Sequence, residues 1–251
     1  MKYKQDYNTR FAIDYIGSNL DNIDTYLALT AGEPTTVFKN NEQINEYFRS
    51  YSPDITYGEA ETIMSYTNRL YGRINSLKRG FWDYEALGRL TPEDKAYYLK
   101  YADDMEKIIN KVTPLQTNIS TYRGTDLKNF RRFGISSLDD LASLLNQYIY
   151  DDSFVSTSLL ANQSFFKENK EAYNGNNIQI EYLIPKDSQD GLFVPLSFYD
   201  VESEYLINCG NLAKVIDVKI DHEKEEAYIK MILVPKKVWD KNYYQESQRN
   251  L

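Results

Sequence analysis

The sequence predicts a fold of the α+β class, in which N-terminal helices precede a mixed, mostly antiparallel β-sandwich core. Up to about residue 113, apolar residues recur at three- and four-residue spacing, which is the periodicity of helices. From about residue 114, short runs alternate apolar and polar residues, which is the periodicity of strands. Regular alternation of strands and helices is missing from the pattern, and this disfavours a doubly wound nucleotide-binding fold.

Helices are expected over residues 21–30, 41–51, 58–80 and 91–112. The last of them begins with Thr91-Pro92-Glu93-Asp94, where a hydroxyl cap is followed by a proline and by acids in the first turn. The helical periodicity ends at Pro114, so we expect the change to strands there.

Strands are expected over residues 119–124, 153–159, 177–185, 191–197, 204–209, 213–220 and 226–235. A single helix, over residues 137–150, is expected to interrupt them. The sequence shows no internal repeat, low-complexity tract or proline-rich linker. We therefore expect one domain over residues 1–251, with a mainly helical part over about 1–113 and a β-rich part over about 114–251.

Composition excludes several classes of protein. A hydrophobic content of 42% with 14% aromatic residues argues against disorder. The net charge of −8 disfavours general nucleic-acid binding. No run of eighteen apolar residues occurs, so no membrane span is expected. The first residues do not resemble a signal peptide, which is compatible with a cytoplasmic protein, with another export route or with a removed leader.

The chain has one cysteine, Cys209, and one histidine, His222. An internal disulfide and a cysteine cluster for zinc are therefore excluded, and Cys209 is expected to be a small buried residue. A Ser-His-Asp or Cys-His enzyme is implausible, and so is a histidine-based metal site. Catalysis would have to use carboxylates, arginines, hydroxyls or a cofactor, and we expect no metal.

Three short stretches carry groups suited to chemistry. Arg123 lies in "TYRGTDL", near the end of an expected strand, and its forked guanidinium can bind a phosphate or a carboxylate. Gly124 follows it and allows a ligand to approach the backbone closely. The second stretch is "FVSTSLL", with three hydroxyls at Ser156, Thr157 and Ser158.

The third stretch is Glu202-Ser203-Glu204, at the start of an expected strand. If it is extended, residues two apart point the same way, and both carboxylates face one spot. Like charges on one face repel unless a cation or a reacting group lies opposite. Taken alone, each of the three stretches is also compatible with an ordinary surface or strand residue.

In this order, the three stretches resemble the signature of the Arg-Ser-Glu class of mono-ADP-ribosyltransferases, and the bacterial toxin members are most similar. "MEKIINKVTPLQTNISTYRGTD" resembles the helix that leads into the arginine strand, and "LDDLASLLNQYIYDDSFVSTSLL" resembles the helix that leads into Ser-Thr-Ser. "YTNRLYGRINSLKRG" resembles the helix that faces NAD, with Tyr71 and Asn75 one turn apart. The resemblance covers roughly residues 60–235.

The resemblance implies transfer of ADP-ribose from NAD to an arginine side chain, with release of nicotinamide. By the family pattern, Glu204 stabilises the oxocarbenium-like transition state through the ribose 2′-hydroxyl. Glu202 orients the acceptor and takes its proton, and a glutamate at this place accompanies modification of arginine. Tyr199 matches an aromatic residue that faces the target protein.

The same pattern implies roles for the donor-binding residues. Arg123, beside Gly124, would bind a phosphate of NAD, and Ser156 would hold Glu204 while Thr157 and Ser158 brace the strand. In the loop over residues 159–177, Phe165 or Phe166 would cover the nicotinamide. The arginine that the family often has in this loop is missing, so Lys167 or Lys170 would have to replace it.

Two other functions stay open at this point: an NAD glycohydrolase that uses the same donor site, and a catalytically silent binding module. The resemblance implies a target protein, such as actin or another host protein. Secretion or delivery into a host cell is favoured, with a separate delivery component, while a cytoplasmic phage or bacterial enzyme is the alternative.

Overall fold

The computed structural model describes residues 20–51, 54–80, 90–164, 177–195 and 203–239. The predicted α+β class is confirmed, with helices first and a mixed, mostly antiparallel sheet afterwards. The α-helices are α2 (Leu20–Ala31), α3 (Asn41–Phe48), α4 (Tyr57–Ser65), α5 (Tyr71–Lys78), α6 (Pro92–Ile109) and the short α7 (Lys236–Trp239). The strands are β1 (Thr35–Thr36), β2 (Asn118–Thr125), β3 (Tyr148–Asp151), β4 (Val155–Ser158), β5 (Ile178–Ile184), β6 (Gly191–Phe193), β7 (Glu204–Ile207), β8 (Asn211–Asp221) and β9 (Glu226–Val234).

The predicted start of α6 is confirmed in its capping geometry. Thr91 Oγ1 accepts a hydrogen bond from the Asp94 backbone N at 3.1 Å, and Asp94 Oδ2 accepts one from the Thr91 backbone N at 3.0 Å. The expected helix over 58–80 is interrupted, because a π-helical segment, Tyr66–Leu70, joins α4 to α5. A π-turn holds an extra residue, so it changes the direction in which the side chains on either side of it point.

The strands form one nine-stranded sheet in the order β3-β8-β9-β5-β2-β4-β7-β6, and β1 pairs with β2 at the side of this path. The pairs β1/β2 and β5/β9 are parallel and the others are antiparallel. A single residue pair, Tyr122 and Ser158, joins β2 to β4. The sheet can therefore bend at this point, and both of its parts contribute side chains to one core.

The expected helix over 137–150 is wrong. A 3₁₀-helix (Asp139–Leu144) is followed by β3, which pairs antiparallel with β8. Asp140 Oδ2 accepts hydrogen bonds from the backbone N of Ser136 and Ser137, which favours a tight local turn over a long helix. Asn146 then has a φ of 66°, and the run Tyr148-Ile149-Tyr150 has the aromatic and β-branched residues that suit a strand.

Four further elements were not foreseen from the pattern: the short β1, α7, the 3₁₀-helix Ala161–Gln163 and a 3₁₀-helix (Leu127–Phe133) directly after β2. Asp126 caps this 3₁₀-helix by accepting a hydrogen bond from the Lys128 backbone N at 3.0 Å. Gly134 ends it with a φ of 80°, a value that glycine adopts without strain. Phe130 of this segment belongs to the main core, and Lys128, Arg131 and Arg132 line the same cavity as Arg123.

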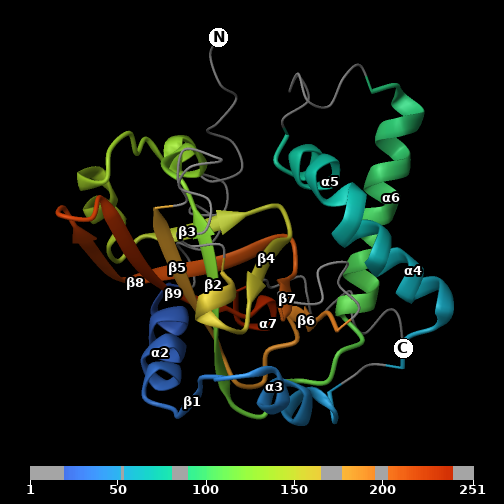
Figure 1. The fold of residues 1–251 in the computed structure, drawn as a ribbon, viewed down its shortest axis with the longest axis horizontal. Coiled ribbons are helices and arrows are strands. Elements are labelled where there is room, and N and C mark those ends of the chain that lie inside the picture. Colours follow the sequence, from blue (N-terminus) through green and yellow to red (C-terminus); the bar gives the residue numbers. More distant parts are fainter. Residues whose placement is uncertain (1–19, 52–53, 81–89, 165–176, 196–202, 240–251) are drawn as a thin grey trace.

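The main core contains residues from both parts of the sheet, such as Ile180 and Met231 on one part and Val155 and Ile207 on the other. A second core joins α4, α5 and α6 to β6 and β7, where Leu206 packs among the helices. In Figure 1 these three helices lie together at one side of the sheet. Cys209 belongs to the second core and is fully buried, as expected.

Candidate active site

Ser156 and Glu204 meet across two paired strands. In the register of β4 and β7, Ser158 lies opposite Glu204 and Ser156 lies opposite Leu206. Residues two apart share a face of a strand, so Ser156 and Glu204 are diagonal neighbours on one face. Ser156 Oγ donates a hydrogen bond to Glu204 Oε1 at 2.6 Å, and Glu204 is 5% exposed. The pairing of strands thus places a buried carboxylate beside a hydroxyl.

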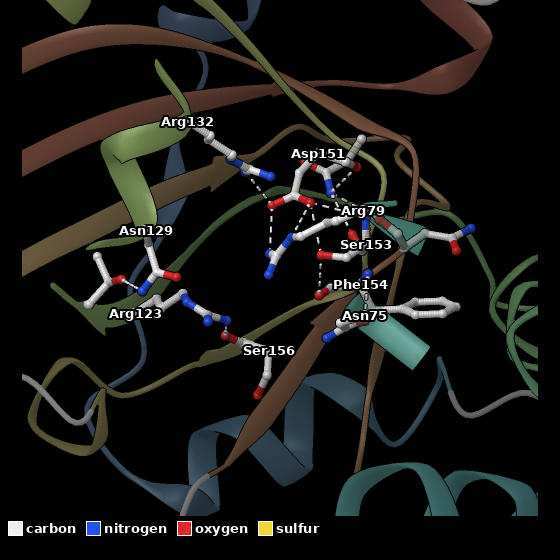
Figure 2. Close-up of polar contacts among 12 residues, drawn as sticks. Asn75, Arg79, Arg123, Asn129, Arg132, Asp151, Ser153, Phe154 and Ser156 are labelled. Atoms are coloured by element: carbon white, nitrogen blue, oxygen red, sulfur yellow. Dashed lines mark hydrogen bonds and ion pairs between the residues drawn. The ribbon is translucent and has the colours of Figure 1, made fainter. Parts of the chain in front are cut away.

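Arg123 approaches the same place from β2. Its Nη1 donates a hydrogen bond to the backbone O of Ser156 at 2.9 Å, so the guanidinium lies against β4, as Figure 2 shows. Burial lowers the pKa of Arg123 from its ordinary value, but a guanidinium is so basic that it stays charged at neutral pH. Ser156 therefore contacts a cation through its main chain and a carboxylate through its side chain.

The neighbours of these residues are bonded to main-chain atoms. Thr157 Oγ1 donates to the backbone O of Tyr205 at 2.6 Å, and Ser158 Oγ accepts from the backbone N of Leu160 at 3.1 Å. The backbone N of Gly124 donates to the backbone O of Ser164. These bonds hold β4 to β7 and join β2 to the segment that follows β4.

Asn75 is bonded to the residue before β4 and to a tyrosine, Tyr66, that the sequence did not single out. Asn75 Oδ1 accepts hydrogen bonds from the backbone N of Phe154 at 3.2 Å and from the hydroxyl of Tyr66 at 3.3 Å. Tyr66 is buried, and burial raises the pKa of its hydroxyl. Tyr71, which the sequence placed beside Asn75, is 53% exposed. The π-turn between α4 and α5 contains Tyr66, and the repeat of a regular helix could not reveal its contact with Asn75.

The extended conformation that would aim both carboxylates of Glu202-Ser203-Glu204 at one spot is interrupted at its middle residue. Ser203 has a φ of 44°, in the left-handed region, and β7 begins at Glu204. Its side chain donates a hydrogen bond to Asn41 Oδ1, at the start of α3, at 2.6 Å. The alternation of side chains along β7 therefore begins at Glu204, and Glu202 lies outside the described residues.

A cavity of about 590 Å³ opens beside Arg123. Guanidinium and ammonium groups on its wall come from the residue that follows α5, from β2 and from the 3₁₀-helix after β2. Among the described residues that line the cavity, Asp151 is the one carboxylate. The cationic residues are Arg79, Arg123, Lys128, Arg131 and Arg132. Aromatic and aliphatic side chains such as Phe130, Ile180 and Met231 line the rest. The cavity is suited to an anionic ligand that also has an apolar part.

Asp151, at the end of β3, binds two arginines that the sequence did not single out. Arg79 donates to it through Nε at 3.1 Å and through Nη2 at 2.8 Å, and Arg132 donates through Nη2 at 2.7 Å. Figure 2 shows both guanidinium groups pointing at the carboxylate. Burial alone would raise the pKa of Asp151, but Arg132 and Arg79 outweigh it and hold the pKa well below its ordinary value.

The sequence carried one signal of the contact among Arg79, Arg132 and Asp151. Arg79 lies four residues after Asn75, so the two share a face of α5, and a search along that face would have found it. Arg132 and Asp151 lie between the elements that the sequence predicted, and the structure places them in the 3₁₀-helix Leu127–Phe133 and in β3. Their contact could therefore not be foreseen.

Six of the expected or alternative site residues lie outside the described part of the chain: Tyr199, Glu202, Phe165, Phe166, Lys167 and Lys170. Within the described ranges, no group of three or more histidine, cysteine or carboxylate side chains is placed to hold a metal ion. None of the helices in these ranges combines the length and the apolar character needed to cross a membrane.

Comparison with protein families and solved structures gives one consistent result. A family model described as ADP-ribosyltransferase exoenzyme matches residues 39–236. The crystal structure of C3stau2 from S. aureus with NAD has a TM-score of 0.62 at 16% identity, and the match covers 80% of this chain and 99% of that chain. An ADP-ribosyltransferase from Clostridium botulinum has a TM-score of 0.62 at 20% identity, and the match again covers 80% of this chain and 99% of that chain.

A third structure is that of BECa, an ADP-ribosylating toxin of a binary enterotoxin of C. perfringens, with NADH. Its TM-score is 0.58 at 18% identity, and the match covers 77% of this chain and 47% of that chain. No curated protein matches the sequence. At these identities the solved structures establish a shared fold. Because the family model matches most of the sequence, from just before α3 to the start of α7, the chain belongs to the ADP-ribosyltransferase exoenzyme family.

Proposed function

We propose that the chain transfers ADP-ribose from NAD to an arginine side chain of a target protein and releases nicotinamide. The observation that carries this proposal is the 2.6 Å hydrogen bond from Ser156 Oγ to Glu204 Oε1. The guanidinium of Arg123 is bonded to the backbone O of the same serine on β4. Family membership and the solved structures with NAD and NADH support NAD as the donor.

In the proposed reaction, the bond between the ribose C1′ and the nicotinamide nitrogen breaks, and its electron pair leaves with nicotinamide, which becomes neutral. Positive charge then develops on the ribose, as it does in glycoside cleavage. A fixed carboxylate stabilises that charge more in the transition state than in the bound substrate. Glu204 has this role, and the hydrogen bond from Ser156 fixes the position of its carboxylate.

Arg123 and the cavity beside it receive the ADP half of the donor. Arg123 contacts Ser156 on one side and lines the cavity on the other, so a diphosphate bound there leaves the nicotinamide end near Glu204. The cationic wall suits the diphosphate, and the apolar wall around Phe130 suits the adenine. Gly124, Asn75, Thr157 and Ser158 support this site through their main-chain contacts.

The acceptor arginine attacks C1′ and must lose a proton, because a guanidinium is protonated throughout the useful pH range. We assign this proton to Glu202, two residues before Glu204 in the sequence, with Tyr199 facing the target protein. Phe166 and Lys170 are proposed to contact the donor from the loop over 159–177. Actin or another host protein is the proposed target, and the binary toxin among the structures with this fold supports a separate delivery component.

The test is an incubation of the purified chain with labelled NAD, with and without agmatine as a guanidino acceptor. Nicotinamide release and labelled adduct are both measured. We expect adduct formation that disappears in Glu202→Gln while much of the hydrolysis remains. The matched control is Glu223→Gln, an exposed acid in the turn between β8 and β9, which should react like the parent chain.

Each other outcome contradicts a defined part of the proposal. Nicotinamide release without any adduct, on agmatine or on host-cell proteins, would support an NAD glycohydrolase. Equal loss of transfer and hydrolysis in Glu202→Gln would place Glu202 in the donor site. An absence of turnover in the parent chain would support a silent binding module.

A further inference from the structure

Two arginines from distant segments share one carboxylate. Arg79 lies at the end of α5 and Arg132 lies on the 3₁₀-helix Leu127–Phe133, and both donate to Asp151 Oδ2, at 2.8 Å and 2.7 Å. Arg79 adds a second bond to Oδ1 at 3.1 Å, which gives a forked pair. All three side chains line the cavity beside Arg123.

Without the carboxylate of Asp151, the guanidinium groups of Arg79 and Arg132 would repel each other and move apart. The side chains of Arg79 and Arg132 are 24% and 23% exposed, so water screens their mutual repulsion only in part. Arg123 adds a third guanidinium on the same cavity wall. Asp151 is 8% exposed and carries the opposing charge that allows the two arginines to converge.

Asp151 also joins the arginines to the strand that carries Ser156. Its Oδ1 accepts hydrogen bonds from the backbone N of Ser153 at 3.0 Å and from Ser153 Oγ at 2.8 Å. Ser153 lies directly before Phe154, whose backbone N is held by Asn75 on α5. The position of α5 and the start of β4 are therefore coupled through Asp151 and Asn75, as Figure 2 shows.

The charge of the cavity wall suits one chemical group. Five cationic side chains line it, including Arg79, Arg123 and Arg132, and Asp151 is the one carboxylate among the described lining residues, so the wall is strongly positive, whereas the diphosphate bridge of a dinucleotide is an anion. The side chains of Arg79 and Arg132 are 24% and 23% exposed and line the cavity, so parts of both remain accessible to a phosphate bound there.

We propose that Asp151 is a positioning residue that holds Arg79 and Arg132 as a paired cationic wall for the diphosphate of the donor. This inference rests on the proposed function for the identity of the donor. Asp151 acts through the two arginines and does not touch the donor itself. Its loss should weaken donor binding more than it slows the chemical step.

The experiment compares Asp151→Asn with the parent chain. The KM and kcat of nicotinamide release are measured, and the Kd for ADP-ribose, which contains the diphosphate, is measured by calorimetry. We expect the KM and the Kd to rise at least about tenfold while kcat falls by less than about threefold, because a charge pair of this kind governs binding. The matched control is Asp217→Asn, an exposed acid paired with Lys219, which should change neither value.

A rise in KM and Kd with little change in kcat distinguishes a positioning role of Asp151 from a role in the stability of the fold alone. Partial unfolding would reduce the active fraction, so it would lower the apparent kcat and leave KM unchanged. If Asp151→Asn does not fold, as judged by circular dichroism, Arg132→Gln tests the same wall and leaves the forked pair between Arg79 and Asp151 intact. Arg132→Lys keeps the positive charge but loses the forked guanidinium. Its KM and its Kd for ADP-ribose should lie between those of Arg132→Gln and those of the parent chain.

Failure of this inference can be told from failure of the proposed function. Parent-like KM and Kd values in folded Asp151→Asn and Arg132→Gln would overturn the inference, even if the parent chain is an active transferase. A parent chain that binds ADP-ribose through this wall but does not turn over NAD would contradict the function and support the inference. A parent chain that binds no ADP-ribose would overturn both.

Discussion

Two buried carboxylates lie near Arg123, and they are held in different ways. Glu204 is 5% exposed and accepts a hydrogen bond from the neutral hydroxyl of Ser156, whereas Asp151 is 8% exposed and binds two guanidinium groups. A hydroxyl fixes a carboxylate without cancelling its charge, while ion pairs neutralise it. The comparison teaches that burial alone does not determine how a carboxylate is held, because a hydroxyl is bonded to one of these two acids and two guanidinium groups are bonded to the other.

The largest expected effect is on Glu204. Glu204→Gln removes the charge with little change of shape, and we expect turnover of NAD to fall by about 10²–10³-fold or more, since a fixed charge opposite the transition state is lost. The melting temperature should stay close to that of the parent chain. Nicotinamide release and thermal unfolding measure the two effects, and turnover near the parent rate would remove Glu204 from the proposed site.

Asp151 should show the opposite of Glu204: its substitution should lower the stability of the fold strongly and slow the chemical step only slightly. Asp151→Asn leaves two guanidinium groups without their counter-charge, and breaking a buried ion pair in this way typically costs about 3–5 kcal/mol in the free energy of unfolding. Urea unfolding at pH 7 measures this loss. A loss below about 1 kcal/mol would mean that solvent already neutralises the cluster, and the contrast with Glu204 would disappear.

The pH dependence of the same pair of proteins follows from the lowered pKa of Asp151. A carboxyl group whose pKa is depressed in the folded state contributes stability above its ordinary pKa of 3.8, and the contribution is lost as the pH falls below that value. The difference in unfolding free energy between the parent chain and Asp151→Asn should therefore be largest near neutral pH and shrink below about pH 4. A difference that grows in acid would contradict the ion-pair account.

A smaller effect is expected from Ser156→Ala, which tests how the hydroxyl serves Glu204. Hydrogen bonds to charged groups contribute about 1.5–3 kcal/mol, so we expect turnover to fall by about 10–100-fold while Glu204 keeps its charge. The control is Ser143→Ala, an exposed hydroxyl bonded to the backbone O of Asp140 at 2.7 Å, for which turnover should not change. An unchanged rate in Ser156→Ala would show that strand pairing alone positions Glu204.

The smallest effect is expected from Tyr66→Phe, which removes the hydroxyl bonded to Asn75 Oδ1 at 3.3 Å. A single hydrogen bond of this kind contributes about 0.5–1.5 kcal/mol to stability. Arg79 directly follows α5, so a shift of α5 would move Arg79 and raise the KM for NAD. Asn75 keeps its bond to the Phe154 backbone N, so we expect this rise to be no more than about twofold. Urea unfolding and steady-state kinetics test both values, and a rise in KM like that expected for Asp151→Asn would place Tyr66 in the donor site.

Much of the site near Glu204 could be predicted from the sequence because it depends on local patterns. The alternation of residues in "FVSTSLL" and "EYLINC" indicated strands, and pairing of such strands brings Ser156 close to Glu204. The sequence misled at Ser203, where a positive φ interrupts the strand pattern. No spacing rule can reveal a left-handed serine whose side chain is bonded to α3.

By itself, the sequence determined the α+β class, the capped start of α6 and the strands that carry Ser156 and Glu204. These features depend on interactions between residues close together in the chain, and such interactions leave a periodic or capping pattern. Only the tertiary structure decided that Tyr148-Ile149-Tyr150 is a strand, because its pairing with β8 outweighs its helical spacing. Only the tertiary structure likewise placed Arg79, Arg132 and Asp151 together, since their contact depends on how α5, the 3₁₀-helix after β2 and β3 pack in space.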